Sequence, residues 1–345
     1  MKNLAKIMGR ILLIAIVLCI YEGGVRFLYQ DYQDTAIYTN RDRAKLEGSI
    51  ETLVLGNSTA QRGFETAILD EELDTVSFNL ATSLQPLAGS YALLKDANKK
   101  NPIKRLFLGV TPQMMEREDV STISKSLVYE RLYGAESKAS YLKDGCKLEE
   151  IPYLFLYSAR VGSYGKISYV KTNVSMKLSS NFQQGETCKK NYKGNGRIEW
   201  KKTFDPETER NTKDTKESFV AEQSQETSLR KIMEYCNDKD IQLILTWIPQ
   251  TEEALAKYED LSEINQYFKG LSQEYQVCFW NFNCYKNAVE IFTNQMFQDK
   301  KHLNKTGGDV FTKEFAMTYN RLQEGEYVGA LFTDDSSYLA EQGGE

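Results

Sequence analysis

Three side chains in this sequence could carry nucleophilic chemistry: Ser58, His302 and Asp299. Ser58 follows the β-propensive run at residues 52–55 and the pair Gly56-Asn57, which predicts a strand that ends in a tight turn. His302 is the only histidine, and Asp299 precedes it by three residues, so the two side chains can lie side by side. A carboxylate that holds one imidazole nitrogen leaves the other free to take a serine proton. These residues therefore indicate acyl transfer or ester hydrolysis through an acyl-serine.

Each of these features also has a purely structural interpretation. A Gly-x-Ser after a strand, an Asp-x-x-His and a lone histidine all occur without catalytic meaning. Their order along the chain favours chemistry, because Ser58 follows the first predicted strand and His302 precedes the last predicted helix. The other elements lie between them.

The chain around these residues alternates between strand and helix signals. Strands are predicted at 52–55, 75–80, 105–111, 241–248 and 277–282, and helices at 64–73, 87–99, 217–239, 261–275 and 306–322. This alternation predicts βαβ units and an α/β fold with a five-stranded parallel sheet. Open sheets of this kind hold their sites at the carboxyl ends of the strands, where Ser58 is expected.

Residues 113–216 interrupt the alternation. They are rich in Tyr, Ser and Lys, with scattered apolar stretches and a turn-rich piece at 191–198. A structureless loop of this length does not fit a compact domain. We therefore expect a largely helical insertion, which could form a cap over the site.

The amino-terminal residues 1–29 are expected to form a signal anchor. Lys2, Lys6 and Arg10 precede the uninterrupted apolar run at 11–20, and no small-residue cleavage site follows it. An uncleaved transmembrane helix is favoured over a cleaved peptide. The positive charge keeps the amino end in the cytoplasm, which predicts a single-pass protein of the cell membrane with its domain on the extracellular side.

The expected domain organisation follows from these segments. After the anchor we expect a polar stalk at 30–49, one domain at 50–323 that contains the insertion 113–216, and a disordered acidic tail at 324–345. Acidic residues (48) outnumber basic residues (43), so nothing favours a nucleic-acid partner.

The six cysteines show no CxxC pair and no zinc-ligand spacing. No metal and no cofactor is implied. Cys146 and Cys188 could pair if the domain faces outward, and buried free thiols are the alternative.

The two blocks around Ser58 and His302 together resemble the SGNH (GDSL-type) hydrolase superfamily. Gly56-Asn57-Ser58 and Asp299-x-x-His302 match its first and last blocks in order and placement, and the resemblance covers roughly residues 50–112 and 217–323. It implies a three-layer α/β sandwich with a flavodoxin-like sheet. It also implies Ser58 as nucleophile, His302 as base and Asp299 as the residue that orients the base.

Further motifs are similar to those of membrane-anchored members. His302-Leu303-Asn304 is followed by Gly307, and Asn79-Leu80 is followed by Gln85, behind an amino-terminal anchor. These features resemble the D-alanyl-lipoteichoic acid biosynthesis and alginate O-acetylation proteins. Those proteins work beside a membrane-bound O-acyltransferase on cell-surface polymers. The resemblance implies a polysaccharide or teichoic-acid-like polymer as partner and acetyl or D-alanyl as the acyl group.

The sequence also departs from the family pattern. Asn57 replaces the usual Asp, and Leu84 stands where the second block normally has a glycine. The third block, at residues 109–112, reads Gly-Val-Thr-Pro and lacks the asparagine that donates to the oxyanion. Loss of one such donor costs about 10²–10³ in rate.

The oxyanion site is therefore expected to rely on backbone groups. We expect the N–H groups of Ser58 and of the Ser83-Leu84 turn to bind the oxyanion, with Asn57 and Gln85 beside them as substrate-binding candidates.

Three functions remain open. The first is a membrane-anchored serine esterase or O-acyltransferase that acts on acetyl or D-alanyl groups of a cell-surface glycopolymer. The second is a non-catalytic scaffold partner of a membrane-bound O-acyltransferase. The third is a secreted carbohydrate esterase with a cleaved signal.

Overall fold

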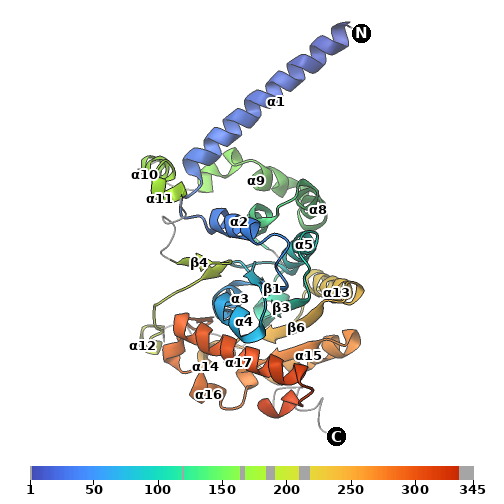
Figure 1. Ribbon diagram of the computed structural model, residues 1–345, viewed down its shortest axis with the longest axis vertical. Coiled ribbons are helices and arrows are strands. Elements are labelled where there is room, and N and C mark those ends of the chain that lie inside the picture. Colours follow the sequence, from blue (N-terminus) through green and yellow to red (C-terminus); the bar gives the residue numbers. More distant parts are fainter. Residues whose placement is uncertain (1, 119, 164–167, 184–190, 210–217, 334–345) are drawn as a thin grey trace.

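A five-stranded parallel sheet forms the centre of the protein (Figure 1). The structure is a computed structural model that describes residues 2–118, 120–163, 168–183, 191–209 and 218–333. The strands are β1 (Thr52–Gly56), β2 (Ser77–Asn79), β3 (Arg105–Gly109), β6 (Gln242–Trp247) and β7 (Cys278–Asn281). Their order is β2-β1-β3-β6-β7, with every neighbouring pair parallel. The α/β prediction is confirmed, and each predicted strand matches one of these.

Helices cover both faces of the sheet because the strands are apolar on both sides. The structure places α5 (Leu87–Asn98), α13 (Gln223–Asp238) and α15 (Leu261–Tyr275) on one face, and α4 (Thr66–Leu73) and α17 (Lys305–Gln323) on the other. Phe107 of β3 and Phe315 of α17 pack with ring centroids 4.7 Å apart. On the opposite face, α13 buries the stripe Leu229, Ile232, Met233 and Cys236 that its helical periodicity predicts. The result is the expected three-layer sandwich.

The insertion is largely helical. Its elements are α6 (Pro112–Met115), α7 (Thr122–Arg131), α8 (Ala135–Gly145), η1 (Leu148–Glu150), α9 (Ile151–Phe155), η2 (Ser158–Ser163), α10 (Ser168–Lys177), α11 (Ser180–Gln183), β4 (Tyr192–Gly194), β5 (Arg197–Ile198) and α12 (Pro206–Glu209). Helix α7 packs on α2 (Thr35–Lys45) and α5, α8 packs on α5, and α10 packs on α1 (Lys2–Tyr29). These helices thus extend the domain toward α1. The segment that reaches the candidate site is the stretch after β4, described below.

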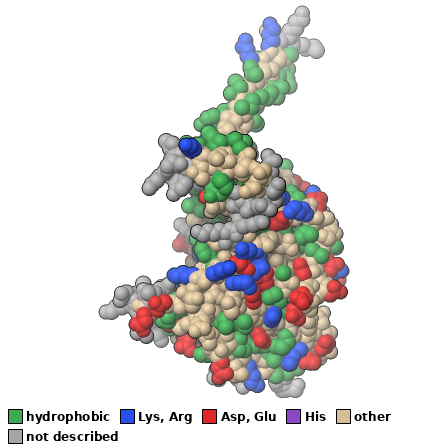
Figure 2. All heavy atoms as spheres, turned by 60° about the vertical axis from the view of Figure 1, so that its left-hand side comes forward, with side chains coloured by type: hydrophobic (Ala, Val, Ile, Leu, Met, Phe, Trp, Pro, Cys, Tyr) green, Lys and Arg blue, Asp and Glu red, His purple; other side chains and the backbone are tan. Residues whose placement is uncertain are grey.

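Helix α1 is long and apolar enough to cross a membrane, although a signal sequence would meet the same test. It projects from one end of the molecule, and Figure 2 shows hydrophobic side chains along it and basic ones near its free end.

The segment predicted as a polar stalk contains α2, which packs on the domain. Its Arg43 is buried and forms an ion pair of 2.9 Å with Asp96 of α5. The charge of Arg43 is thus buried and paired, which sequence reasoning could not distinguish from an exposed charge.

The domain continues past residue 323. Short elements follow β6 and β7: α14 (Glu252–Leu255), η3 (Phe282–Cys284), α16 (Ala288–Ile291), η4 (Asn294–Met296) and, after α17, η5 (Val328–Leu331). Phe332 is buried and bridges to Tyr285, so the first part of the predicted tail packs on the domain. Residues 334–345 lie outside the described residues, as does Cys188 of the suggested Cys146–Cys188 pair. The thiol of Cys146 is free.

Candidate active site

Ser58 begins a helix at the carboxyl end of β1. Helix α3 (Ser58–Gly63) follows the strand after one residue, Asn57, whose side-chain Oδ1 accepts a hydrogen bond from the Thr59 N–H (2.9 Å). Asn57 is thus the N-cap of α3. This strand-cap-helix arrangement replaces the simple turn that the sequence predicts. It fixes the serine hydroxyl at the edge of the sheet.

Gly56 makes this abrupt change of direction possible. Its φ is +132°, and a Cβ there would lie 2.6 Å from the carbonyl oxygen of Gly109 and 2.9 Å from Cβ of Ala60. Strands β1 and β3 therefore approach each other and α3 more closely than any side chain would allow. This close packing explains why a glycine stands two residues before Ser58.

His302 and Asp299 come from a short hairpin that faces Ser58. Strands β8 (Phe297–Asp299) and β9 (His302–Leu303) pair just before α17. Ser58 Oγ lies 2.7 Å from His302 Nε2, and His302 Nδ1 lies 2.7 Å from Asp299 Oδ1. The structure thus brings together the three residues that the sequence singles out, at the separations of a serine-histidine-carboxylate relay.

The residues after His302 anchor the hairpin. Asn304 caps α17 by accepting from the Gly307 N–H (3.1 Å), and its amide donates to the Gln295 carbonyl (2.7 Å). A Cβ on Gly307 would clash with the backbone of Met296. The His-Leu-Asn spacing before Gly307 therefore holds His302 in place rather than binding a ligand.

Asp299 is held as a carboxylate. Burial alone would raise its pKa, but the hydrogen bond and charge of His302 and donation from Gln298 (2.8 Å) and the Lys301 N–H (3.0 Å) outweigh it. The pKa of Asp299 lies well below its usual range. The carboxylate therefore remains charged and orients His302 across the physiological pH range.

Arg62 and Trp200 belong to the site but were not predicted. Arg62, four residues after Ser58 on α3, places a guanidinium nitrogen 3.7 Å from the outer oxygen of Asp299. Trp200, from the insertion, lies over that guanidinium. The Trp200 carbonyl also accepts from the Lys305 N–H (2.8 Å). The i, i+4 spacing could have revealed Arg62 had α3 been predicted, whereas Trp200 carries no local signal.

The turn at residues 82–85 borders the serine. The Thr82 N–H donates to the Gly56 carbonyl at 3.3 Å, and Leu84 has a φ of +55°. Leu84 therefore adopts the left-handed conformation that a glycine would take. Among the hydrogen bonds of the described residues, none uses the N–H groups of Ser58, Ser83 or Leu84. These N–H groups remain candidate oxyanion donors.

Asn57 and Gln85 have structural partners. Besides capping α3, Asn57 donates through Nδ2 to Thr111 Oγ1 (3.1 Å). Gln85 is fully buried and donates to Ser90 Oγ (2.9 Å). Thr111, which stands in the third block, is buried and caps α6. These contacts explain Asn57 and Thr111 without a ligand, whereas the buried Oε1 of Gln85 has no hydrogen-bond partner among the described residues.

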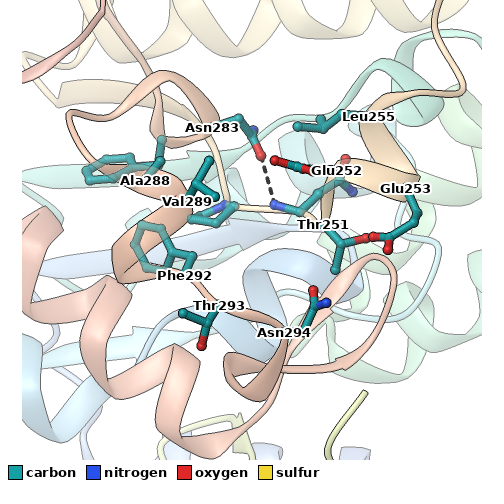
Figure 3. Close-up of a pocket in the computed structure, with 13 residues that line it drawn as sticks. Thr251, Glu252, Glu253, Leu255, Asn283, Ala288, Val289, Phe292, Thr293 and Asn294 are labelled. Carbon is teal, nitrogen blue, oxygen red and sulfur yellow. Dashed lines mark hydrogen bonds between the residues drawn. The ribbon is translucent and has the colours of Figure 1, made fainter. Parts of the chain in front are cut away.

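A depression lies beside the hairpin, at the carboxyl ends of β6 and β7 (Figure 3). It has a volume of about 300 Å³, and the N–H of Thr251 in its wall donates to the Lys300 carbonyl (3.1 Å). Its described lining includes Glu252, Glu253 and Asn294 but no Lys or Arg. The depression therefore suits a neutral or positively charged group better than an anion. Within the described part of the chain, no group of three His, Cys, Asp or Glu side chains could hold a metal.

Comparison with known proteins gives only distant similarity. No protein-family model and no curated protein matches the chain. A Streptococcus pneumonia structure provisionally named a platelet activating factor is 12% identical, covers 88% of this chain and 99% of its own, and has a TM-score of 0.39. A Bacteroides fragilis structure provisionally named an acylhydrolase is 10% identical, covers 85% and 98%, and has a TM-score of 0.35. At these scores the similarity establishes neither family nor activity.

Proposed function

We propose that this protein is a membrane-anchored serine esterase or O-acyltransferase that acts on acyl groups, acetyl or D-alanyl, of a cell-surface glycopolymer. The observation that carries the proposal is the geometry of Ser58, His302 and Asp299. Ser58 Oγ lies 2.7 Å from His302 Nε2, and His302 Nδ1 lies 2.7 Å from Asp299 Oδ1. A hydroxyl, an imidazole and a carboxylate in this order form a nucleophile, a base and its orienting group.

The reaction would proceed through an acyl-serine. Ser58 Oγ attacks the acyl carbon while His302 Nε2 takes the hydroxyl proton. Collapse of the tetrahedral intermediate breaks the bond to the leaving oxygen, which receives that proton from His302. Water or an acceptor hydroxyl then attacks the acyl-serine and gives its proton to His302. Release of the acyl group returns the proton to Ser58 Oγ.

Backbone groups would stabilise the oxyanion. The N–H of Ser58 is among the groups that a helix leaves unpaired at its first turn. The left-handed conformation of Leu84 preserves the backbone arrangement expected of glycine in the Ser83-Leu84 turn. The N–H groups of Ser58 and of the Ser83-Leu84 turn would thus donate to the oxyanion in place of the asparagine that the third block lacks.

The acidic depression beside the hairpin is compatible with either acyl group, although Ser58, His302 and Asp299 are not part of its lining. A D-alanyl ester carries an ammonium group, which the carboxylates of Glu252 and Glu253 would attract, whereas an acetyl ester is neutral. Both fit the absence of basic side chains from the described lining.

One observation favours the scaffold alternative. Thr111 is buried and its hydroxyl already contacts Asn57 and the Met114 N–H, so the third block contributes no exposed side-chain donor. A scaffold partner of a membrane-bound O-acyltransferase would keep the fold without turnover.

Reaction of the full-length chain with a fluorophosphonate separates the two functions. The reagent should label the wild type on Ser58, and Ser58→Ala should lose the label together with hydrolysis of p-nitrophenyl acetate. Ser49→Ala, which changes an exposed serine before β1, serves as the control and should retain both. In cells that lack the native protein, a Ser58→Ala chain that restores polymer acylation would overturn the enzyme proposal.

A further inference from the structure

The protruding part of α1 has the length of a membrane core. Residues 3–21 are exposed on all sides, including Leu12 (62%) and Ile20 (70%). At 1.5 Å per residue this part is about 28 Å long, against about 30 Å for the hydrocarbon layer of a bilayer. An apolar helix exposed in every direction is unfavourable in water. A bilayer would cover its apolar residues, while Lys6 and Arg10 would extend toward the headgroups at the cytoplasmic end.

The last two turns of α1 are instead fixed to the insertion. The Ser158 N–H donates to Glu22 (3.0 Å), and the guanidinium of Arg26 lies 5.5 Å from the ring centroid of Tyr157. Lys177 Nζ donates to the Phe27 carbonyl (2.7 Å). The helix therefore leaves the domain at about residue 22, with no flexible stalk between them.

The insertion exposes apolar side chains close to the point at which α1 leaves the domain. The run at 151–157 consists entirely of aliphatic, aromatic and proline residues, and it includes helix α9. Phe155 is 65% exposed and lies three residues before Ser158, the residue that binds Glu22. Three residues span at most about 11 Å. Leu148, just before α9, is 81% exposed.

We propose that the α9 surface, formed by Leu148, Pro152 and Phe155, lies in the interfacial layer of the same membrane that α1 crosses. The occupant of this surface is the lipid bilayer, because the surface is continuous with the point at which α1 leaves the domain. Figure 1 shows α9 beside the base of α1. Exposed Phe and Leu side chains are favoured at the boundary between headgroups and acyl chains.

This orientation has a consequence for the substrate. In Figure 1 the inserted helices and α2 lie between α1 and the sheet that carries α3. Helix α3, which begins at Ser58, would therefore be separated from the bilayer surface by these helices. Ser58 would reach acyl groups on a polymer that extends from the membrane rather than those on lipid headgroups. The proposed membrane contact of the α9 surface depends on anchoring by α1 but not on the chemistry at Ser58.

Photo-crosslinking in lipid tests the α9 surface. The full-length chain would carry p-benzoylphenylalanine at one position and be reconstituted in vesicles of phosphatidylcholine and phosphatidylglycerol. Three positions have similar exposure: Tyr21 (58%) in α1, Phe155 (65%) in α9 and Val289 (67%) in α16. Helix α16 lies at the end of the molecule opposite α1 in Figure 1 and provides the control.

The proposal expects lipid adducts, identified by mass spectrometry, at Tyr21 and Phe155 and several-fold fewer at Val289. Adducts at Tyr21 without adducts at Phe155 would overturn the α9 surface while leaving the anchor intact. A crosslink from Phe155 to a second copy of the chain would overturn it in favour of a protein interface. Failure at Tyr21 would refute the anchoring and the α9 surface together, whereas fluorophosphonate labelling of Ser58 would be unaffected.

Discussion

The ring of Trp200 lies over the guanidinium of Arg62, with the ring centroid 5.2 Å from the guanidinium carbon. Because Arg62 also lies 3.7 Å from Asp299, this stacking connects the insertion to the candidate catalytic carboxylate. Burial lowers the pKa of Arg62 and the charge of Asp299 opposes that effect, so the guanidinium stays charged beside the carboxylate. Arg62 thus interacts with Oδ2 of Asp299, while Oδ1 of Asp299 binds His302.

Arg62→Gln should lower kcat for p-nitrophenyl acetate about tenfold, equivalent to about 1.4 kcal/mol, with little change in KM. The reason is that Arg62 positions Asp299 and does not touch substrate. Arg62→Lys should recover most of kcat because it restores the charge. Arg230→Gln, which removes a surface arginine paired with Glu226 and Glu274, should have no effect. Equal losses in the Gln and Lys variants would exclude a charge-based positioning role.

Leu84 offers a test of the strained turn. A non-glycine residue at φ +55° carries a strain of about 1–2 kcal/mol. Leu84→Gly removes this strain at an entropic cost of about 0.5–1 kcal/mol, so its free energy of unfolding should match or exceed that of the wild type. Leu84→Val also shortens the side chain but should destabilise, because β-branched residues tolerate this conformation least. Urea denaturation of both variants measures the difference, and equal stability would contradict the assigned backbone conformation.

Much of the fold could be predicted because the strands and helices have clear periodicity. The runs at 105–111 and 241–248 are apolar because both faces of β3 and β6 are buried, and the stripe on α13 faces the sheet. Ser58, His302 and Asp299 could be chosen together because the chain has one histidine, and because Ser58 follows the first predicted strand while Asp299 and His302 precede the last predicted helix.

The other features of the fold and the site could not be predicted, because they depend on contacts between segments that are far apart in the sequence. Nothing in the local sequence around Trp200 indicates that it reaches Arg62. The polar residues of α2 predicted an exposed stalk, because the partner of Arg43, Asp96, lies more than fifty positions away in the sequence. The helix at Ser58 is only six residues long, too short for periodicity to reveal it.

Glu65 should make stability depend on pH near neutrality. Burial raises its pKa to about 7, and the nearby carboxylates of Asp309 and Glu199 add to the effect that Arg197 opposes. Because the folded state holds this proton more tightly, the free energy of unfolding should fall as the pH rises from 4.5 to about 7. The loss should be on the order of 2 kcal/mol.

Glu65→Gln should remove this dependence. Denaturation at pH 5 and pH 8 should show a decline for the wild type that the variant lacks, since glutamine does not titrate. Arg197 keeps Glu199 as a partner in the variant, which limits secondary damage. Parallel pH profiles for the two proteins would show that Glu65 titrates normally.

Gly56 and Gly48 form a matched pair for testing the close approach of β1 and β3. Both have positive φ, +132° and +88°, but a Cβ on Gly48 meets nothing within 4 Å, whereas one on Gly56 lies 2.6 Å from the Gly109 carbonyl oxygen. Gly48→Ala should therefore cost only the backbone strain of about 1–2 kcal/mol. Gly56→Ala should cost roughly 3 kcal/mol or more, because the strand or α3 must move. Any Gly56→Ala protein that folds should also lose fluorophosphonate labelling, because that movement separates Ser58 from His302. Equal destabilisation and full labelling in both variants would show that neither the strand spacing nor the position of the serine depends on this glycine.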